Sequence, residues 1–352
     1  MSRPSPHLSI ILVARNDNYS GDFNDRLQNS MHWLACIVEK KKLPTELLIV
    51  DYNPVPENRP LMQMLNWPQN RSYLSIRLVH VPNETHQQLI NPQVRKTVPL
   101  FEFNAKNMGI RRAKGEYILC TNADILLHPS IIEFIAKKIP NKKCYYRTDR
   151  FDYKSIDLYD FDNPDTTLQR IRQKVFRLML KGYGYYIEGG ENIFKETLIR
   201  LKNSVRIFRD LNLVKIEFLA NLLRISINYD GFAHKYHTHC SGDFMLMHRD
   251  NWFNLRGYPE DTYISTHCDA IFTVIASASG LRETILRWPV YHQDHERRYN
   301  TNFDEIKHDK DINDMFKRLL KETREMEASC QPKIFNPPDW GHATENFAET
   351  TI

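Results

Sequence analysis

The residues best suited to chemistry are an amide and an acid, Asn122 and Asp124, that follow the short apolar segment Tyr117–Cys120. That segment predicts a buried β-strand, and ligands of open α/β sheets bind at the carboxyl ends of such strands. The helix expected just before it carries Arg111 and Arg112 on its polar side. An acid beside basic residues predicts an anionic ligand, with a metal ion between the carboxylate and the anion.

A second group of candidates begins at Asp243, before an expected strand and helix, and continues to Asp269. Asp269 lies at the start of an apolar helix expected over residues 270–280. The N-terminus of a helix keeps a carboxylate ionised, as a general base must be. Asp is also a common residue in the first turn of a helix that carries no chemistry. The sequence leaves both interpretations open.

Two histidines, His292 and His295, follow the apolar segment Trp288–Tyr291, which predicts another strand. Imidazoles are common ligands of divalent metal ions, so both histidines are candidates for the ion expected beside Asp124. The alternative is that both are surface histidines in a loop. Three upstream histidines have a spacing that matches no standard zinc pattern, and we expect them to be structural or to contact a bound substrate. These are His234, His237 and His239.

Polar residues also close the first two expected strands, Leu8–Val13 and Glu46–Val50. Asp51 follows the second strand, and its carboxylate can accept hydrogen bonds from a base N–H or a ribose hydroxyl. Arg15 and Asn16 follow the first strand, and a guanidinium group matches the geometry of phosphate. The alternatives are that Asp51 and Asn16 are turn residues and that Arg15 is a surface charge.

The helix and strand before Asp124 carry the pattern N-x-G-x-x-x-A-x-G followed by E-Y-I. This pattern resembles the inverting family 2 of nucleotide-sugar glycosyltransferases, which have the GT-A fold. The matching residues are Asn107, Gly109, Ala113, Gly115, Glu116, Tyr117 and Ile118. The family's D-x-D metal motif stands here as Asn122-Ala123-Asp124, so its first acid is replaced and its second is kept. The run from Gly242 to Glu260 is similar to the acceptor-side motif of galactosyltransferase-like GT-A enzymes.

The resemblance implies a glycosyltransferase that moves a sugar from a nucleoside diphosphate to an acceptor hydroxyl with inversion. A UDP-sugar is expected ahead of a GDP-sugar, with a glycan or another hydroxyl compound as acceptor. Asp269 would remove the hydroxyl proton, Asp243 would position hydroxyls, and Asp124 with His292 and His295 would bind Mn²⁺ or Mg²⁺. The expected nucleotide-sugar-binding residues are Arg15, Asn16, Asp51, Asn107, Arg111, Arg112, Asn122 and Asp124.

Apolar strands alternate with amphipathic helices along the chain, which predicts an α/β fold with a mostly parallel central sheet flanked by helices. The resemblance makes this Rossmann-like sheet a GT-A domain. Gly115 is expected in the left-handed conformation that ends a helix. Long helical periodicity over Leu168–Lys181 and Phe194–Arg224 predicts a helical insertion, and the tail from Ser329 is expected to be partly disordered or draped over the surface. The expected units are a nucleotide-sugar-binding half (1–150), a mainly helical insertion (151–236), an acceptor and catalytic half (237–300), and a C-terminal helix and tail (301–352).

Composition places the chain among ordinary globular proteins of the cytoplasm. Its 352 residues carry a net charge of +5, which requires no nucleic-acid partner, and no apolar run reaches the length of about 18 residues of a membrane helix. The six scattered cysteines lack C-x-x-C spacing and predict reduced thiols. Basic residues between Arg170 and Lys181 form either a solvated helix face or a peripheral contact with an anionic membrane.

Two other functions remain open at this point. A nucleotidyltransferase would also place acids at strand ends, but it normally has a glycine-rich phosphate loop after the first strand, and residues 14–18 contain no glycine. A non-catalytic sugar- or nucleotide-binding relative is the other alternative, and the replaced acid at Asn122 favours it.

Overall fold

The computed structural model describes residues 5–69, 71–90, 98–156, 158–181, 183–186, 236–260, 268–296 and 321–352. The strands are β1 (Leu8–Ala14), β2 (Thr45–Tyr52), β3 (Leu74–Val81), β4 (Tyr117–Cys120), β5 (Ile125–Leu127), β6 (Cys144–Tyr153), β7 (Val175–Leu180), β8 (Tyr183–Tyr186), β9 (Met245–His248), β10 (Arg282–Gln293) and β11 (Ala348–Thr351). The α-helices are α1 (Phe23–Lys41), α2 (Leu61–Met64), α3 (Asn83–Leu89), α4 (Glu102–Arg112), α5 (Pro129–Ala136), α6 (Pro164–Lys174), α9 (Arg249–Leu255) and α10 (Cys268–Ala278). Two short 3₁₀ helices are η1 (Tyr19–Gly21) and η2 (Ser241–Asp243), and residues 321–329 are also helical.

One mixed β-sheet forms the centre of the molecule, with the strand order β11-β3-β2-β1-β4-β9-β6-β10-β5. The strands β3, β2, β1 and β4 run parallel to one another, as the alternation of strands and helices predicted. β9 pairs antiparallel with both β4 and β6, and β6 runs parallel to β10. The predicted α/β fold with a helix-flanked sheet is confirmed.

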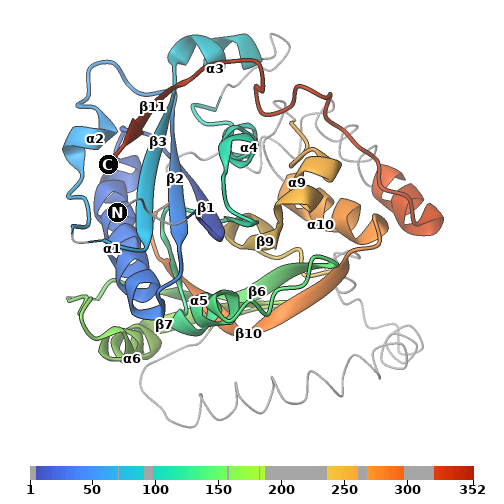
Figure 1. The fold of residues 1–352 in the computed structure, drawn as a ribbon. Helices are drawn as coiled ribbons and strands as arrows, with labels where there is room; N and C mark the ends of the chain where they lie inside the picture. The colour runs from blue at the N-terminus through green and yellow to red at the C-terminus, as the bar shows by residue number, and fades with distance from the viewer. Residues whose placement is uncertain are drawn as a thin grey trace.

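Helices α1 and α4 cover opposite faces of the parallel strands (Figure 1). The predicted apolar stripe of α1, which includes Leu27 and Met31, packs in the same core as Leu47 and Ile49 of β2. The alternate residues of β2 point to the other face and pack with α4. Because both faces are covered, β2 is apolar along most of its length.

Two glycines let α4 and the turn after it approach the sheet closely. A Cβ atom on Gly109 would lie 2.5 Å from the Cγ2 atom of Ile11. The prediction for Gly115 is wrong, because this glycine is not among the residues with positive φ. Gly115 is needed for space instead, since a Cβ atom there would lie 2.5 Å from the backbone nitrogen of Ser9.

The segment Leu168–Lys181 is only partly the helix that its periodicity predicted. α6 ends at Lys174, and β7 then pairs antiparallel with β6. Hydrogen bonds with the edge of β6 satisfy the backbone polar groups of β7, and these bonds outweigh the helical preference of its sequence. Phe194–Arg224 lies outside the described residues, so the division into four units stays a prediction.

The tail after residue 329 is draped over the molecule and ends as a strand of the sheet. Trp340 is 2% exposed within the core on the α4 side. β11 then pairs antiparallel with β3 at the edge of the sheet, where the chain returns beside its N-terminal half (Figure 1). The described part of the tail therefore belongs to the packed structure.

The described residues also bear on two expectations from composition, which concern the cysteines and membrane-spanning helices. The six cysteines are free thiols, as their scattered positions predicted. No described helix has the length and apolarity that crossing a membrane requires.

Replacing Gly115 by Ala tests the close approach of the turn to β1. The added methyl group would overlap backbone atoms of Leu8 and Ser9, so we expect the free energy of unfolding to fall by about 1–3 kcal/mol. Lys114→Ala is the matched control at an exposed neighbour and should change it by about 0.5 kcal/mol or less. Urea denaturation measures the stability of both variants. If Gly115→Ala is as stable as the wild type, the account is contradicted.

Candidate functional site

Asp124 lies between β4 and β5, at the end of the sheet where the sequence predicted a ligand. β5 pairs antiparallel with β10 and sets Ile125 opposite His292. The backbone N–H of Gln293 donates to the carbonyl oxygen of Asp124 at 3.0 Å. This pairing brings the end of β10 and the residues after it against the acid.

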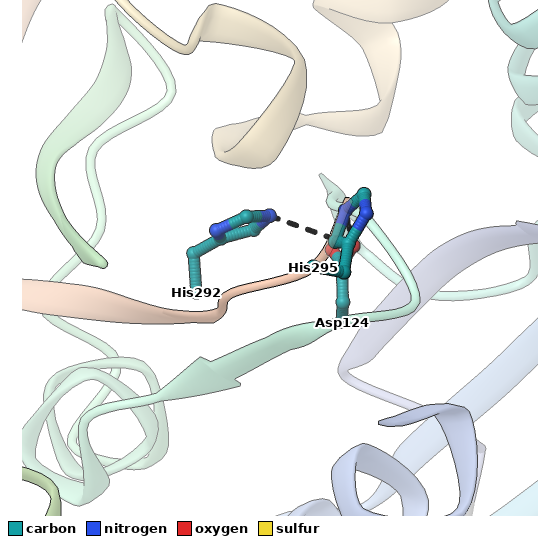
Figure 2. A group of neighbouring side chains, drawn as sticks. All are labelled: Asp124, His292 and His295. Carbon is teal, nitrogen blue, oxygen red and sulfur yellow. Dashed lines mark ion pairs between the residues drawn. The ribbon is translucent and has the colours of Figure 1, made fainter. Parts of the chain in front are cut away.

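Asp124, His292 and His295 form a compact cluster (Figure 2). The Nε2 atom of His292 lies 3.5 Å from Oδ2 of Asp124, and Nε2 of His295 lies 3.2 Å from the same oxygen. One ligand atom from each residue lies within 4.8 Å of the other two. The structure thus brings together the three residues that were predicted to bind a metal ion.

The donor atoms of this cluster fit a divalent ion. Oδ1 of Asp124 is buried and has no hydrogen-bond partner among the described residues, so it is available as a ligand. One carboxylate and two imidazoles leave coordination positions open for water or phosphate oxygens. Imidazole nitrogens favour a transition-metal ion over Mg²⁺, which takes oxygen ligands.

Ion pairing shifts the pKa values within the cluster. Burial alone would raise the pKa of Asp124, but His292 and His295 hold it well below its ordinary value. Burial likewise opposes a charge on His292, yet Asp124 and Asp152 raise the pKa of this imidazole to about 9. Without a metal ion, His292 is therefore protonated at neutral pH, and a metal ion has to displace that proton.

Arg26 of α1 holds the same carboxylate and was not identified from the sequence. Its Nη1 atom donates to Oδ2 of Asp124 at 3.1 Å, and the side chain is 5% exposed. The signal that identifies it is its position in α1, in phase with buried Ser30 and Trp33. A charge at a buried helical position indicates an ion-pair partner elsewhere in the fold.

A series of buried ion pairs leads away from the cluster. Nδ1 of His292 lies 3.2 Å from Oδ1 of Asp152, and Nε of Arg150 lies 2.8 Å from that oxygen. Arg177 also pairs with Asp152, while Nη1 of Arg150 donates to Oδ2 of Asp243 at 2.7 Å. Sequence analysis did not identify Arg150 or Asp152, although charges within an otherwise buried strand indicate such pairs.

Asn122, which replaces the first acid of the D-x-D motif, connects Asp243 to the buried Lys106. Its Nδ2 atom donates to Oδ1 of Asp243 at 2.8 Å, and its Oδ1 atom accepts from Nζ of Lys106 at 2.6 Å. A carboxylate at position 122 could not donate to Asp243 and would repel it, so an amide fits this place. Both oxygens of Asp243 are engaged by protein groups, and its predicted contact with substrate hydroxyls stays a prediction.

Asp269 lies in the first turn of α10, as predicted, and is half-buried. Its Oδ2 atom accepts hydrogen bonds from Oγ of Ser241 and from the backbone N–H of Gly242, each at 2.6 Å. Lys106 donates to the carbonyl oxygen of Gly242 at 2.8 Å. Lys106 therefore links the backbone that holds Asp269 to Asn122, and the network is continuous from the cluster of Asp124, His292 and His295 to Asp269.

Arg15 and Asn16 lie at the end of β1 and organise the loop that follows β2. Nε of Arg15 donates to the carbonyl oxygen of Asn53 at 2.7 Å. The side chain of Asn16 is 1% exposed, and its nitrogen and oxygen both bond the backbone within residues 55–59. Asn16 thus shapes the loop, and direct nucleotide contact stays a prediction for both residues.

Asp51 is buried at the end of β2. Its Oδ2 atom lies 3.1 Å from Nδ1 of His80, whose other ring nitrogen lies 3.0 Å from Oγ1 of Thr350. Burial raises the pKa of Asp51, although His80 acts in the opposite direction. Oδ1 of Asp51 is buried and has no hydrogen-bond partner in the described part of the chain.

Asn107, Arg111 and Arg112 make their described contacts away from Asp124. Asn107 makes three hydrogen bonds with the turn at residues 258–260. Arg111 lies over the ring of Trp340, and Arg112 donates to carbonyl oxygens at residues 341–345. These three residues therefore bind the turn and the tail, and no described contact supports their predicted role toward a nucleotide.

Comparison with solved structures gives similarity to Staphylococcus aureus TarS. The crystal structure of TarS 1-349 aligns with a TM-score of 0.43 and 11% identity, over 81% of this chain and 60% of that one. Its complex with UDP aligns with a TM-score of 0.39 and 10% identity, and its complex with UDP-GlcNAc with 0.40 and 11%. The chain spans about 60% of the length of these structures. No family model and no curated relative matches the sequence.

The raised pKa of His292 predicts a pH dependence of stability in the metal-free protein. The ion pair stabilises the fold fully below pH 6.5, and this stabilisation is lost as the pH rises through about 9. The difference in unfolding free energy between the wild type and His292→Gln should therefore shrink by on the order of 3 kcal/mol over that range.

Urea denaturation in the presence of a chelator measures this difference. His32→Gln serves as control, because His32 of α1 bonds the carbonyl oxygen of Asn66 and lies outside the cluster. Parallel pH profiles for the wild type and His292→Gln would contradict the assignment.

Proposed function

We propose that this protein is a divalent-metal-dependent glycosyltransferase that uses a nucleoside-diphosphate sugar. The observation that carries the proposal is the cluster of Asp124, His292 and His295 at the end of the sheet. Its donor set is suited to an ion that also binds phosphate oxygens. The resemblance of the surrounding motifs to GT-A enzymes agrees with this assignment, and a UDP-sugar is the expected donor.

In this proposal the cluster binds Mn²⁺, with Asp124, His292 and His295 as its protein ligands. The ion would stabilise the negative charge that develops on the leaving diphosphate. Asp51 offers the free Oδ1 atom as an acceptor for an N–H of the base. Arg15 and Asn16 shape the loop beside it.

Asp269 is the proposed general base. Its described hydrogen bonds are both to Oδ2, which fixes the carboxylate and leaves Oδ1 to take the proton of the acceptor hydroxyl. The hydroxyl oxygen forms a bond to the anomeric carbon while the bond from that carbon to the phosphate oxygen breaks. The nucleoside diphosphate leaves with the bonding electron pair, and a single displacement of this kind inverts the anomeric configuration.

The ion-pair network gives this chemistry a fixed frame. Asp243 joins Arg150 to Asn122, and Lys106 joins Asn122 to the backbone of Gly242. Preorganised groups of this kind need no rearrangement at the moment of reaction. In the proposal, Asp243 is a positioning residue for the base and for the metal site.

The contacts also bear on the two alternatives. A nucleotidyltransferase needs a loop after β1 that wraps phosphates with its backbone, whereas the side chain of Asn16 ties this loop to residues 55–59. A non-catalytic relative was favoured by the replaced acid at position 122. The replacement has a structural explanation instead, because the amide of Asn122 bonds both the cation of Lys106 and the carboxylate of Asp243.

Calorimetric titration with UDP and with GDP, each with and without Mn²⁺, tests the proposal. We expect one nucleotide to bind and Mn²⁺ to raise its affinity at least tenfold, because the ion joins the diphosphate to the cluster. His292→Ala combined with His295→Ala should abolish the gain from Mn²⁺, whereas the control His32→Ala should retain it. Binding of neither nucleotide under any condition would contradict the proposal.

Asp269→Asn separates a transferase from a binding protein when two quantities are measured. Nucleotide binding is measured by the same titration, and sugar release from the donor is measured in an activity assay. This variant should bind nucleotide and Mn²⁺ as the wild type does, and it should lose at least 100-fold in sugar release from the donor. Asp250→Asn, at an exposed position of α9, is the matched control and should keep the wild-type rate. A wild type that binds nucleotide but never releases sugar would favour the non-catalytic alternative.

A further inference from the structure

Arg26 places a permanent positive charge on the carboxylate of the proposed metal site. Its Nη1 atom lies 3.1 Å from Oδ2 of Asp124, its Nε atom donates to Asp22 at 3.1 Å, and its Nη2 atom donates to the carbonyl oxygen of Tyr19 at 3.0 Å. The three contacts fix the guanidinium group in a buried position. A histidine can release its proton to a metal ion, but an arginine stays charged.

Asp124 is the only carboxylate among the three residues of the cluster. The first D-x-D acid is Asn122, and Asp152 is offset by Arg150 and Arg177. Arg150 is shared with Asp243, and Arg26 pairs with both Asp124 and the half-exposed Asp22. A divalent ion bound to Asp124 would share this carboxylate with the permanent positive charge of Arg26, which opposes its binding.

We propose that Arg26 makes metal binding depend on the nucleotide. The ion binds well only together with a diphosphate, whose oxygens supply the negative charge that a second carboxylate would otherwise supply. The inference rests on the proposed function, since it takes a nucleoside diphosphate as the ligand. By linkage, the factor by which the nucleotide tightens metal binding equals the factor by which the metal tightens nucleotide binding.

A purely orienting role for Arg26 makes the opposite prediction. If Arg26 only holds Asp124 in position, every substitution should weaken the metal site. If its charge limits metal binding, Arg26→Gln should bind the ion more tightly without nucleotide, and Arg26→Lys, which keeps the charge, should not. The two roles are therefore separated by the sign of the change.

The experiment measures Mn²⁺ affinity by calorimetry, without nucleotide and at saturating UDP. For the wild type we expect weak binding of Mn²⁺ alone and at least tenfold tighter binding with UDP. Arg26→Gln should bind Mn²⁺ alone at least tenfold more tightly than the wild type, and the effect of UDP should shrink by the same factor. Arg249→Gln of α9 controls for the change in total charge and should behave as the wild type does.

A second variant keeps the test informative if Arg26→Gln does not fold. Asp22 is about half exposed and partly neutralises Arg26, so Asp22→Asn leaves the contacts of Asp124 in place while making the site more positive. This variant should weaken the binding of Mn²⁺ alone by about threefold or more and enlarge the effect of UDP. If the affinity for Mn²⁺ alone is unchanged, or changes in the opposite direction, in both variants, the inference is overturned.

The outcome for Arg26 is distinguishable from that for the proposed function. Failure of UDP to bind the wild type would count against the proposed function, while the comparison with Mn²⁺ alone would still decide the role of the arginine charge. Tight binding of Mn²⁺ alone to the wild type, or no binding of Mn²⁺ alone to Arg26→Gln, would overturn the inference even if UDP binds.

Discussion

The antiparallel pairing of β5 with β10 is the constraint on which the site depends. It sets Ile125 opposite His292 and directs two imidazoles from late in the chain at the carboxylate that follows β4. A shift of one residue in a strand moves each side chain to the other face of the sheet. The register therefore decides whether the acid and His292 can share an ion, and the core around β10 and α5 holds that register.

Burial of charge then determines what surrounds the cluster. Each ionised group placed inside the protein needs a partner, because an unpaired charge there is strongly destabilising. Asp152 meets Arg150 and Arg177, and Arg150 also meets Asp243. Hydrogen bonds through Asn122, Lys106 and Gly242 extend this network to Asp269, so the groups proposed for donor binding and for proton removal are fixed relative to one another. The same rule explains why Asn122 replaces the first acid of the D-x-D motif. Its amide bonds the cation of Lys106 and the anion of Asp243 at once.

Much of the fold and part of the site were predictable from the sequence. Apolar periodicity placed β1, α1 and β4, because local pattern and tertiary burial agree in these elements. Asp124 and the two histidines stood out because polar residues directly after apolar strands gather at one end of a parallel sheet.

Long-range contacts set the limits of that prediction. The sequence does not show that the tail returns over α4, where Arg111 lies over the ring of Trp340 and Arg112 donates to the carbonyl oxygen of Gly341. Arg26 and Asp152 lie within a helix and a strand whose patterns reveal burial but not the identity of the partner. β7 shows the same limit, because a free sheet edge overrides local helical preference.

Pulsed electron paramagnetic resonance of Mn²⁺ bound together with UDP tests the central claim most directly. The account predicts hyperfine coupling from nitrogens of two imidazoles, one of which disappears in His292→Gln and the other in His295→Gln. A spectrum with couplings from phosphate and water alone, unchanged by either substitution, would mean that these histidines do not bind the ion and would contradict the account.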